Sequence, residues 1–420
     1  MTSPGHFVQV GATRDGLDPY LDSARRREMP AVLVETPAYL RWRRALGRRP
    51  FDIELGVDQP QDPEAVRAAL DAAGVTPALV LTGFERYVQA GFALARMLRV
   101  APWPAVGEDF RPLDKRQQRD ALLRASAPVG QPRFAVLGTG GEPEGAELGY
   151  PQVVKPVDGG GGLGVLLVDG AEQRHRALER IRSTANYGGG AFAGVVAEEF
   201  VKGPEVSLQG IAHAGRPVLL SVCEKLTTLE EVPGEPGLAG FREVGHVARH
   251  GGTAEPGLET LAAACLNAVG YREGPFHIDV IQGPQGPVFV EMGFRLSGGG
   301  LVDLVARATG ADWAELAFRA HLDNEAPAPP PAGAPAGQVV AVSEEELTAG
   351  AALGPAGAMV EVVRTVPPPP LDLIAPEDRA ALASDRLRHT GAAGRVIVTG
   401  GRAEHVRAAL QSVVAHRLRG

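Results

Sequence analysis

Residues 274–300 read GPFHIDVIQGPQGPVFVEMGFRLSGGG, and the remainder of the chain is interpreted outward from them. Two apolar runs joined by a Gly/Pro turn predict two paired strands, and a flexible glycine run follows them. Asp279 and Glu291 lie within the strands, and Arg295 lies four residues beyond Glu291. Carboxylates suit Mg²⁺, which often binds through one or two of them together with substrate phosphates, and arginine stabilises charge on a transferred phosphoryl group. The stretch therefore predicts a metal–phosphate site.

The overall composition narrows the class of protein. A chain of 420 residues exceeds one small core, so we expect two or three domains. The net charge of −8 without a basic block argues against nucleic-acid binding, and no apolar run is long enough to span a membrane. The first residues, MTSPGHFVQVGATRDG, lack the basic start and apolar core of a secretory signal, and the isolated Cys223 and Cys265 form no disulfide framework. We expect a cytoplasmic protein.

Lysine is rare in this chain, and its positions are informative. Only four of the 42 basic residues are lysines, and all fall in the middle of the sequence: Lys115, Lys155, Lys202 and Lys225. Lysine is a compact point charge that arginine does not replace, so these residues are candidates for specific chemistry. Lys115 opens an amphipathic helix expected over 114–125 with Asp114 as N-cap, where an ordinary surface lysine is the competing interpretation.

Residues 1–110 are expected to form a small α/β domain. Apolar runs that alternate with helical patterns indicate a parallel sheet, and the predicted strands are HFVQVG at 6–11, AVLVE at 31–35 and LVLTG at 79–83. The turn at 11–16 lacks the G-x-G-x-x-G spacing, which favours a simple strand–helix connection over a nucleotide site. A substrate contact from this turn stays open, because ligands gather at the carboxyl ends of such strands.

Residues 150–170, YPQVVKPVDGGGGLGVLLVDG, predict a phosphate-binding loop. A strand ends at Lys155, four glycines follow, and a second strand begins beyond them. Glycines allow consecutive backbone N–H groups to wrap phosphate oxygens, and the lysine adds a positive charge nearby. The loop is not a Walker loop, since no G-K-[ST] ends it. A hairpin tip is the alternative, but four glycines exceed what a tight hairpin needs.

Two further segments carry candidate polar residues. In 194–212 a strand bearing Glu198 precedes a Gly/Pro turn and Glu205, so its backbone could read an adenine and Glu205 could hold ribose hydroxyls. A solvated acidic strand edge explains that segment equally well. Lys225 and His246 lie in the next strand-forming region, where no partner at metal-ligand spacing supports a zinc site. Beyond a Pro/Ala/Gly-rich segment at 326–337, short strands and a closing helix suggest a structural or dimer-forming domain.

Seven motifs in this order resemble the ATP-grasp superfamily, most closely the carboxylate–amine ligase group that includes L-amino-acid ligases. The motifs are DK at 114–115, VVKP at 153–156 with the glycine loop, EEFVKGPEVS at 198–207, SVCEKLTT at 221–228, EVGH at 243–246, FHIDV at 276–280 and VEMGFR at 290–295. The resemblance implies an α/β (α+β) ATP-grasp fold with an N-terminal parallel α/β domain at 1–110. It places the ATP-grasp domain at 111–325, with a lid at about 126–200, and a small C-terminal α+β domain at 326–420.

The same resemblance implies site residues. In the nucleotide site, Lys115 and Lys155 would contact the phosphates, and Gly160, Gly161 and Gly162 within the loop 158–164 would close over them. Glu198, Phe200 and Val201 would line the adenine, and Glu205 would hold the ribose. Asp279 and Glu291 would hold Mg²⁺ or Mn²⁺. The reacting end would be formed by Arg295, Lys225, His246 and the segment Ser297–Gly300.

The chain departs from the family pattern where the metal should bind. Many ATP-grasp enzymes read E-x-N-P-R, with asparagine as a further metal ligand, whereas this chain has Gly293 at that position. Asp279 also stands where glutamate is common, which shortens its reach by one methylene. EVGH is followed by VARHGG without the proline often found there. The metal shell and the acceptor pocket are therefore expected to differ from the usual arrangement.

The expected activity is ATP-dependent formation of an amide or peptide bond. A carboxylate would take the γ-phosphate of ATP to give an acyl phosphate, and an amine would then displace phosphate, with positioning and charge neutralisation supplying most of the catalysis. The expected partners are a small carboxylate, such as an amino acid, and an amine. His246 is a candidate base for the amine. The alternatives are a small-molecule kinase and a nucleotide-binding protein whose catalysis has decayed, which Gly293 encourages.

Overall fold

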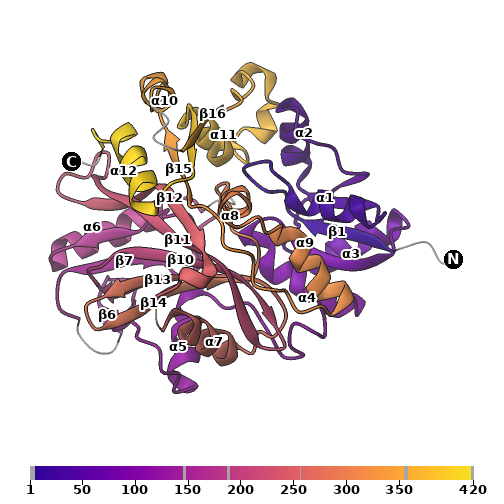
Figure 1. Cartoon of the computed structure of the whole chain (residues 1–420), viewed down its shortest axis with the longest axis horizontal. Helices are drawn as coiled ribbons and strands as arrows, with labels where there is room; N and C mark the ends of the chain where they lie inside the picture. Colours follow the sequence, from indigo (N-terminus) through magenta and orange to yellow (C-terminus); the bar gives the residue numbers. More distant parts are fainter. Residues whose placement is uncertain (1–4, 145–147, 187–189, 256, 354–357, 418–420) are drawn as a thin grey trace.

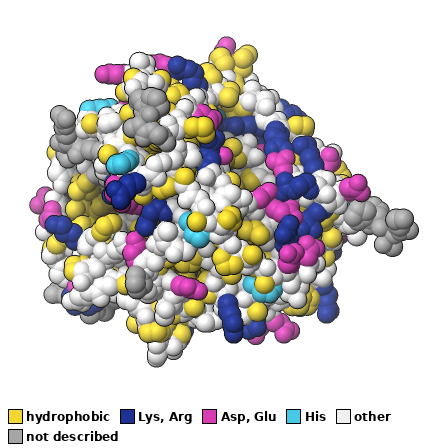
Figure 2. Space-filling model, in the orientation of Figure 1, with side chains coloured by type: hydrophobic (Ala, Val, Ile, Leu, Met, Phe, Trp, Pro, Cys, Tyr) yellow, Lys and Arg dark blue, Asp and Glu magenta, His cyan; other side chains and the backbone are white. Residues whose placement is uncertain are grey.

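The computed structural model describes residues 5–144, 148–186, 190–255, 257–353 and 358–417. Its two β-sheets lie side by side, with the N-terminal sheet at one end of the molecule and the larger sheet forming the centre (Figure 1). Among the described residues, no helix has the length and apolarity needed to cross a membrane. On the face drawn in Figure 2, Lys and Arg side chains are interspersed with Asp and Glu, so this face has no strip of one charge for a polyanion.

The N-terminal sheet is parallel, as the alternation of strands and helices predicts. Its strand order is β3-β2-β1-β4. The strands are β1 His6–Val10, β2 Ala31–Glu35, β3 Ile53–Gly56 and β4 Pro77–Thr82. The helices are α1 Pro19–Arg26, α2 Pro37–Ala45, α3 Pro63–Ala72 and α4 Val88–Leu98, with the 3₁₀ turn η1 Glu85–Tyr87 before α4. β3 was not predicted, because it is an edge strand of four residues without a continuous apolar run.

The central sheet is antiparallel throughout its named pairs. Starting from one edge, its order is β14-β13-β10-β11-β12-β8-β7-β9-β5-β6. The strands of its first half are β10 Glu205–His213, β11 Arg216–Glu231, β12 Ala239–His250, β13 Gly274–Gly283 and β14 Gly286–Gly293. The paired strands predicted at 274–293 are thus confirmed as β13 and β14. Helices α5 Lys115–Arg124 and α7 Leu258–Val269 lie beside this half (Figure 1).

The second half of the sheet is joined to the first over a short contact. Only Ala239 and Gly240 of β12 pair with Leu167 and Leu166 of β8. The elements of this half are β5 Phe134–Leu137, β6 Pro143–Glu144, β7 Gln152–Pro156, β8 Leu166–Val168, β9 Val195–Glu199 and the helix α6 Ala171–Ser183. They bury their own apolar cluster, so this half packs largely against itself.

The C-terminal strands extend the same sheet. β15 Ala336–Ala341 pairs with β12, β17 Gly394–Thr399 pairs with β15, and β16 Met359–Arg364 pairs with β17. The remaining elements are α8 Leu301–Thr309, α9 Trp313–Phe318, the π-helical turn η3 Arg319–Asp323, α10 Glu344–Ala351, the 3₁₀ turns η4 Leu371–Leu373 and η5 Pro376–Asp378, α11 Ala383–Thr390, and α12 Ala403–Val413; a further 3₁₀ turn, η2 Gly251–Thr253, follows β12. The domain boundaries given above stay predictions.

A shared apolar core fixes the N-terminal sheet against the central one. One cluster joins Phe7 and Tyr20 to Trp313 and Phe318, and Arg26 on α1 forms ion pairs with carboxylates of α9 and its N-cap. Burial of aromatic side chains of this size dominates such interfaces, while the exposed ion pairs contribute little. This packing holds the carboxyl ends of β1 and β4 beside the end of β14.

Candidate active site

The two predicted metal carboxylates lie directly opposite each other. Asp279 on β13 is the register partner of Glu291 on β14, and Ser207 on β10 is the partner of Asp279 on its other side. Partners in an antiparallel pair point to the same face of the sheet, so the three side chains form one row. Ser207 Oγ donates a 2.6 Å hydrogen bond to Asp279 Oδ1, which fixes that carboxylate.

Lys225 on β11 lies at the centre of an acidic cluster. Its Nζ is 2.5 Å from Asp279 Oδ2, 2.7 Å from Glu205 Oε1 and 3.6 Å from Glu243 Oε2. Burial opposes its charge, but the carboxylates of Asp279, Glu205 and Glu243 raise the pKa of Lys225 well above its usual value. Burial and the neighbouring Asp279 also raise the pKa of Glu205, although Lys225 opposes the shift. The cluster therefore favours cations.

Lys115 pairs with the other metal carboxylate. The structure confirms the predicted helix with Asp114 as N-cap, in a capping box that Gln117 completes, and this helix start places Lys115 on the first turn. Lys115 Nζ lies 2.8 Å from Glu291 Oε2 and also donates to the carbonyl of Gly159. Burial alone would raise the pKa of Glu291, but Lys115 and Lys225 lower it to about 2. The lysine thus links the metal carboxylate to the glycine loop.

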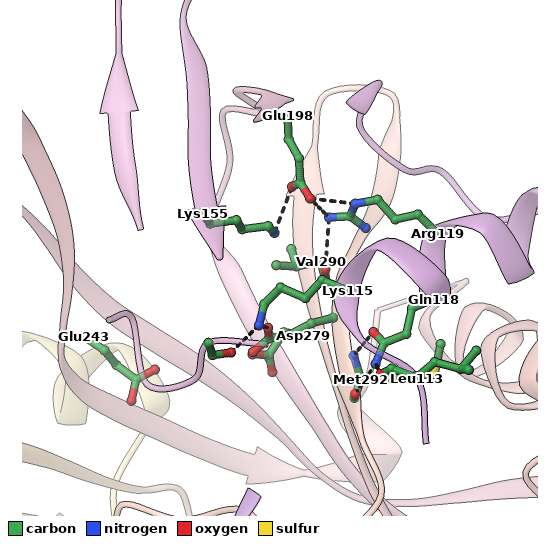
Figure 3. A network of polar contacts seen from close by, with 12 residues as sticks. Leu113, Lys115, Gln118, Arg119, Lys155, Glu198, Glu243, Asp279, Val290 and Met292 are labelled. Atoms are coloured by element: carbon green, nitrogen blue, oxygen red, sulfur yellow. Dashed lines mark hydrogen bonds and ion pairs between the residues drawn. The ribbon is translucent and has the colours of Figure 1, made fainter. Parts of the chain in front are cut away.

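A second buried network surrounds Lys155. Glu198 accepts from Lys155 Nζ at 2.8 Å and from Arg119 Nε at 2.6 Å, and Figure 3 shows its carboxylate facing both cations. Burial lowers the pKa of Lys155, and the nearby Arg119 and Lys115 act in the same direction. Burial opposes the charge on Glu198, yet Arg119 and Lys155 hold its pKa below the usual value. This end of the site carries excess positive charge and favours anions.

The glycine loop connects β7 to β8 above these lysines. Gly161, Gly162 and Gly164 have φ values of +60°, +74° and +75°, in the left-handed region that side chains disfavour. An added Cβ at Gly160 would meet nothing within 4 Å, so this residue borders open space. The loop therefore has the conformation and the room that approach to a phosphate chain requires.

The predicted adenine segment follows β9. The Glu198 side chain is committed to Lys155 and Arg119, so an adenine contact from this residue would have to come from its backbone. The Phe200 ring stacks on Phe241 with centroids 6.2 Å apart, and both rings are partly exposed. Val201 is also partly exposed. Their roles in adenine binding stay predictions.

His246 on β12 lies beside the acidic cluster. It is the register partner of Lys225, and its Nε2 lies 3.1 Å from Glu243 Oε1, within ion-pair distance but not aligned for a hydrogen bond. Burial raises the pKa of Glu243, but His246 and Lys225 outweigh it and hold that pKa well below its usual value. An ionised Glu243 can therefore stabilise a protonated imidazole at position 246.

Arg295 is not paired with the metal carboxylates. Its Nε lies 2.7 Å from Glu85 Oε2 at the carboxyl end of the N-terminal sheet, and its Nη1 donates to the carbonyl of Leu296. Next to it, the N–H of Gly300 donates to Asp15, and Gln338 Nε2 donates to the carbonyl of Gly299. The segment Ser297–Gly300 thus contacts the N-terminal domain through Asp15 and the C-terminal strand β15 through Gln338.

The charges around the row fit a divalent cation. Among the described residues, Glu205, Glu243, Asp279 and Glu291 contact two ammonium groups, those of Lys115 and Lys225, which leaves a formal excess of two negative charges. Within the described ranges, however, no three His, Cys, Asp or Glu side chains converge on one point. Protein side chains can therefore supply only part of a metal shell, and substrate phosphates and water suit the remaining positions.

Several residues of the site were not predicted from the sequence. Arg119 lies four residues after Lys115 on the same helix face, a spacing that could have linked the two. Ser207 and Glu243 lie within motifs already noted but were assigned no role. His277 lies two residues before Asp279 on the same strand face, and alternation along a strand could have revealed it.

Comparisons with known proteins address the family. Residues 148–303 match the family described as the ATP-grasp domain. A D-alanine–D-alanine ligase of Aromatoleum aromaticum is 28% identical over 285 residues, covering 60% of this chain and 86% of that protein. Dapdiamide A synthase of Enterobacter agglomerans is 25% identical over 150 residues, covering 36% of this chain and 34% of that protein.

The fold agrees with these sequence matches. The crystal structure of an L-amino acid ligase from Bacillus licheniformis superposes with a TM-score of 0.66, covering 99% of this chain and 98% of that one at 17% sequence identity. At this identity the likeness concerns the fold alone. The predicted fold class, a mixed α/β chain with a parallel sheet beside a large antiparallel one, is confirmed.

Proposed function

Because residues 148–303 match the ATP-grasp domain family, we propose that this chain is an ATP-dependent carboxylate–amine ligase. The product is an amide or peptide bond, and the first substrate is an amino acid or another small carboxylic acid. The ligase names of the two sequence relatives support this activity. The observation that carries this proposal is the separation of charge within the site. The cations around Lys155 lie under the glycine loop, and the acidic cluster around Lys225 lies next to them.

In the first step a carboxylate oxygen of the substrate attacks the γ-phosphorus of ATP. The new P–O bond forms as the bond to the β,γ-bridging oxygen breaks, and ADP leaves with that electron pair. Lys115 and Lys155 bind the phosphate oxygens, and the glycine loop excludes water from the acyl phosphate. Arg295 exchanges Glu85 for the transferred phosphoryl group, whose charge it neutralises.

Asp279 and Glu291 are the residues suited to hold Mg²⁺ or Mn²⁺ here. A bound divalent ion supplies charge neutralisation for the phosphates. Lys225 and Lys115 form ion pairs with the same two carboxylates. Lys225 also holds Glu205 in place, where its carboxylate can accept from the ribose hydroxyls.

In the second step an amine attacks the acyl carbon. The C–N bond forms, phosphate leaves, and the amine nitrogen must lose a proton. His246 accepts that proton, and the ionised Glu243 stabilises the resulting imidazolium. Neither step needs a covalent enzyme nucleophile.

The test measures ADP release from Mg-ATP over a panel of carboxylic acids, with hydroxylamine as the trapping amine. Hydroxamate formation that depends on one acid is expected. ADP without hydroxamate on every acid would instead indicate a kinase, and ATP binding without any ADP would indicate decayed catalysis. The Arg295→Ala variant should lose turnover and keep ATP binding, whereas the exposed Arg242→Ala variant should keep both.

A further inference from the structure

Gly293 leaves a space in the site that a neighbouring side chain fills. Gly293 on β14 is the register partner of His277 on β13. A Cβ added at Gly293 would lie 2.2 Å from His277 Nε2 and 2.7 Å from its Cε1. The imidazole therefore occupies the position that a side chain at residue 293 would take.

The imidazole has polar capacity that the protein does not use. In the described part of the chain, Nε2 of His277 is shielded from solvent and has no hydrogen-bond partner. A buried polar group without a partner costs about 1–3 kcal/mol, so its retention needs a reason. A histidine that served only to fill space would cost this much more than an apolar residue of similar volume.

The position of His277 relative to the carboxylates supplies that reason. His277 and Asp279 are two residues apart on β13, so their side chains project from the same face. Glu291 is the partner of Asp279 and lies two residues before Gly293 on β14. The imidazole is therefore the neighbouring side chain on that face, one step along β13 from Asp279 and diagonally across from Glu291.

We propose that the imidazole of His277 is a metal ligand, which joins Glu291 and the nucleotide phosphates around one divalent ion. This inference rests on the proposed function for the presence of a nucleotide. It replaces the asparagine ligand that the family resemblance implies at residue 293 with a donor from the adjacent strand. This inference narrows the carboxylate pair proposed above to Glu291, because Asp279 is already held by Ser207 and Lys225. One carboxylate and one imidazole agree with the finding that, among the described residues, no three such side chains converge.

The donor set has a consequence for metal preference. Imidazole nitrogen suits first-row transition metals such as Zn²⁺, whereas Mg²⁺ prefers oxygen ligands in octahedral geometry. Mn²⁺ also favours oxygen, but it belongs to the first-row series that binds mixed nitrogen and oxygen sites. We expect Mn²⁺ to bind this chain at least tenfold more tightly than Mg²⁺ in the presence of nucleotide.

The experiment uses the full chain with Mn²⁺ and β,γ-methylene ATP, which binds without turnover. Pulsed electron paramagnetic resonance should detect a ¹⁴N coupling typical of bound imidazole in the unaltered protein. His277→Ala should abolish that coupling and weaken Mn²⁺ about tenfold or more. His246→Ala, which removes the other nearby imidazole, should leave the coupling in place.

A double variant tests the exchange of ligands. His277→Ala with Gly293→Asn should regain most of the Mn²⁺ affinity without regaining the ¹⁴N coupling. No ¹⁴N coupling in the unaltered protein, or unchanged Mn²⁺ affinity in His277→Ala, would overturn the proposal. Hydroxamate formation is measured separately in the unaltered protein. Normal hydroxamate formation without a ¹⁴N coupling would reject His277 as a metal ligand. A ¹⁴N coupling without hydroxamate formation would reject the ligase activity.

Discussion

Lys155 and Lys225 are both buried lysines beside carboxylates, yet their surroundings act in opposite directions. Lys155 shares one carboxylate, Glu198, with Arg119, and the pKa values of both Lys155 and Glu198 are lowered. Lys225 has three carboxylates around it, and the pKa values of both Lys225 and Glu205 are raised. Burial is the largest cause of the lowered pKa of Lys155 and of the raised pKa of Glu205. The three carboxylates outweigh burial in raising the pKa of Lys225, whereas Lys225 and His246 outweigh it in lowering the pKa of Glu243.

Under the proposed function, this difference would let neighbouring parts of the site bind the two partners of a Mg-ATP complex. The end around Lys155 has more cations than carboxylates, so its charge favours anions such as phosphate oxygens. The end around Lys225 has more carboxylates than cations, so its charge favours a cation such as a metal ion. The lysines at the two ends are therefore not equivalent, and four variants or conditions would expose the difference.

The largest effect is expected for Glu198→Gln. The change leaves Arg119 and Lys155 buried without a counter-charge, so the free energy of unfolding should fall by about 4 kcal/mol. Urea unfolding monitored by circular dichroism measures it. Glu199→Gln is the matched control, because Glu199 and its partner Arg133 are much more exposed and the loss should stay below about 0.5 kcal/mol. Equal losses in both variants would remove the special role of the Lys155 network.

Lys225→Met should cost about 3 kcal/mol in the metal-free protein, because three carboxylates then face one another uncompensated. Mg²⁺ or Mn²⁺ should restore much of that loss. Lys155→Met should show no such recovery, since it removes positive charge from the anion-binding end. Thermal unfolding with and without the metal provides the measurement, and the exposed Lys202→Met serves as control. Equal recovery of both lysine variants would contradict a polarised site.

The decrease in the free energy of unfolding at acidic pH should depend on Glu291. The folded-state pKa of Glu291, about 2, lies below its usual value of 4.5, so its contribution is present above pH 4.5 and is lost as the pH falls toward 2. Between pH 6 and pH 3 this amounts to about 2 kcal/mol. Urea unfolding should therefore show a pH dependence that is smaller by this amount in Glu291→Gln. An unchanged slope in the variant would show that Lys115 does not stabilise the carboxylate.

The smallest effect concerns the loop above the phosphates. Gly162→Ala places a side chain at φ +74° and should weaken ATP binding by about 1 kcal/mol, or roughly fivefold. Gly160→Ala, which meets open space, should change the affinity less than twofold. Calorimetric titration with the non-hydrolysable analogue compares them. If both variants bind alike, the left-handed conformation is not part of the bound state.

Local patterns predicted much of the fold. The capping box at Asp114, the strands β13 and β14 and the parallel N-terminal sheet were all visible, because each depends on residues close together in sequence. The register that places Asp279 opposite Glu291 follows from the short turn between their strands. β3 was missed for lack of an apolar run, and the pairing of β15 with β12 was missed because it joins residues about 90 apart.

The site was predicted in its residue types more than in its connections. Lys115, Lys155 and Lys225, a glycine loop and two carboxylates were predicted to form a nucleotide site, which stays a prediction, but the ion pair of Glu198 with Arg119 joins separate motifs and was not predicted. His277 was overlooked because the vacancy at Gly293 was considered along β14 only. The neighbour that fills it lies on the adjacent strand, which only the register reveals.

The pairing of β15 with β12 also has a consequence for synthesis on the ribosome. The parallel N-terminal sheet uses residues 6–82 and can assemble as soon as they emerge. The carbonyl of Gly299 accepts a hydrogen bond from Gln338, and Gln338 in turn accepts one from Arg395. A nascent chain can therefore form this contact beside Gly299 only after Arg395 has been translated, about 300 residues after the N-terminal sheet.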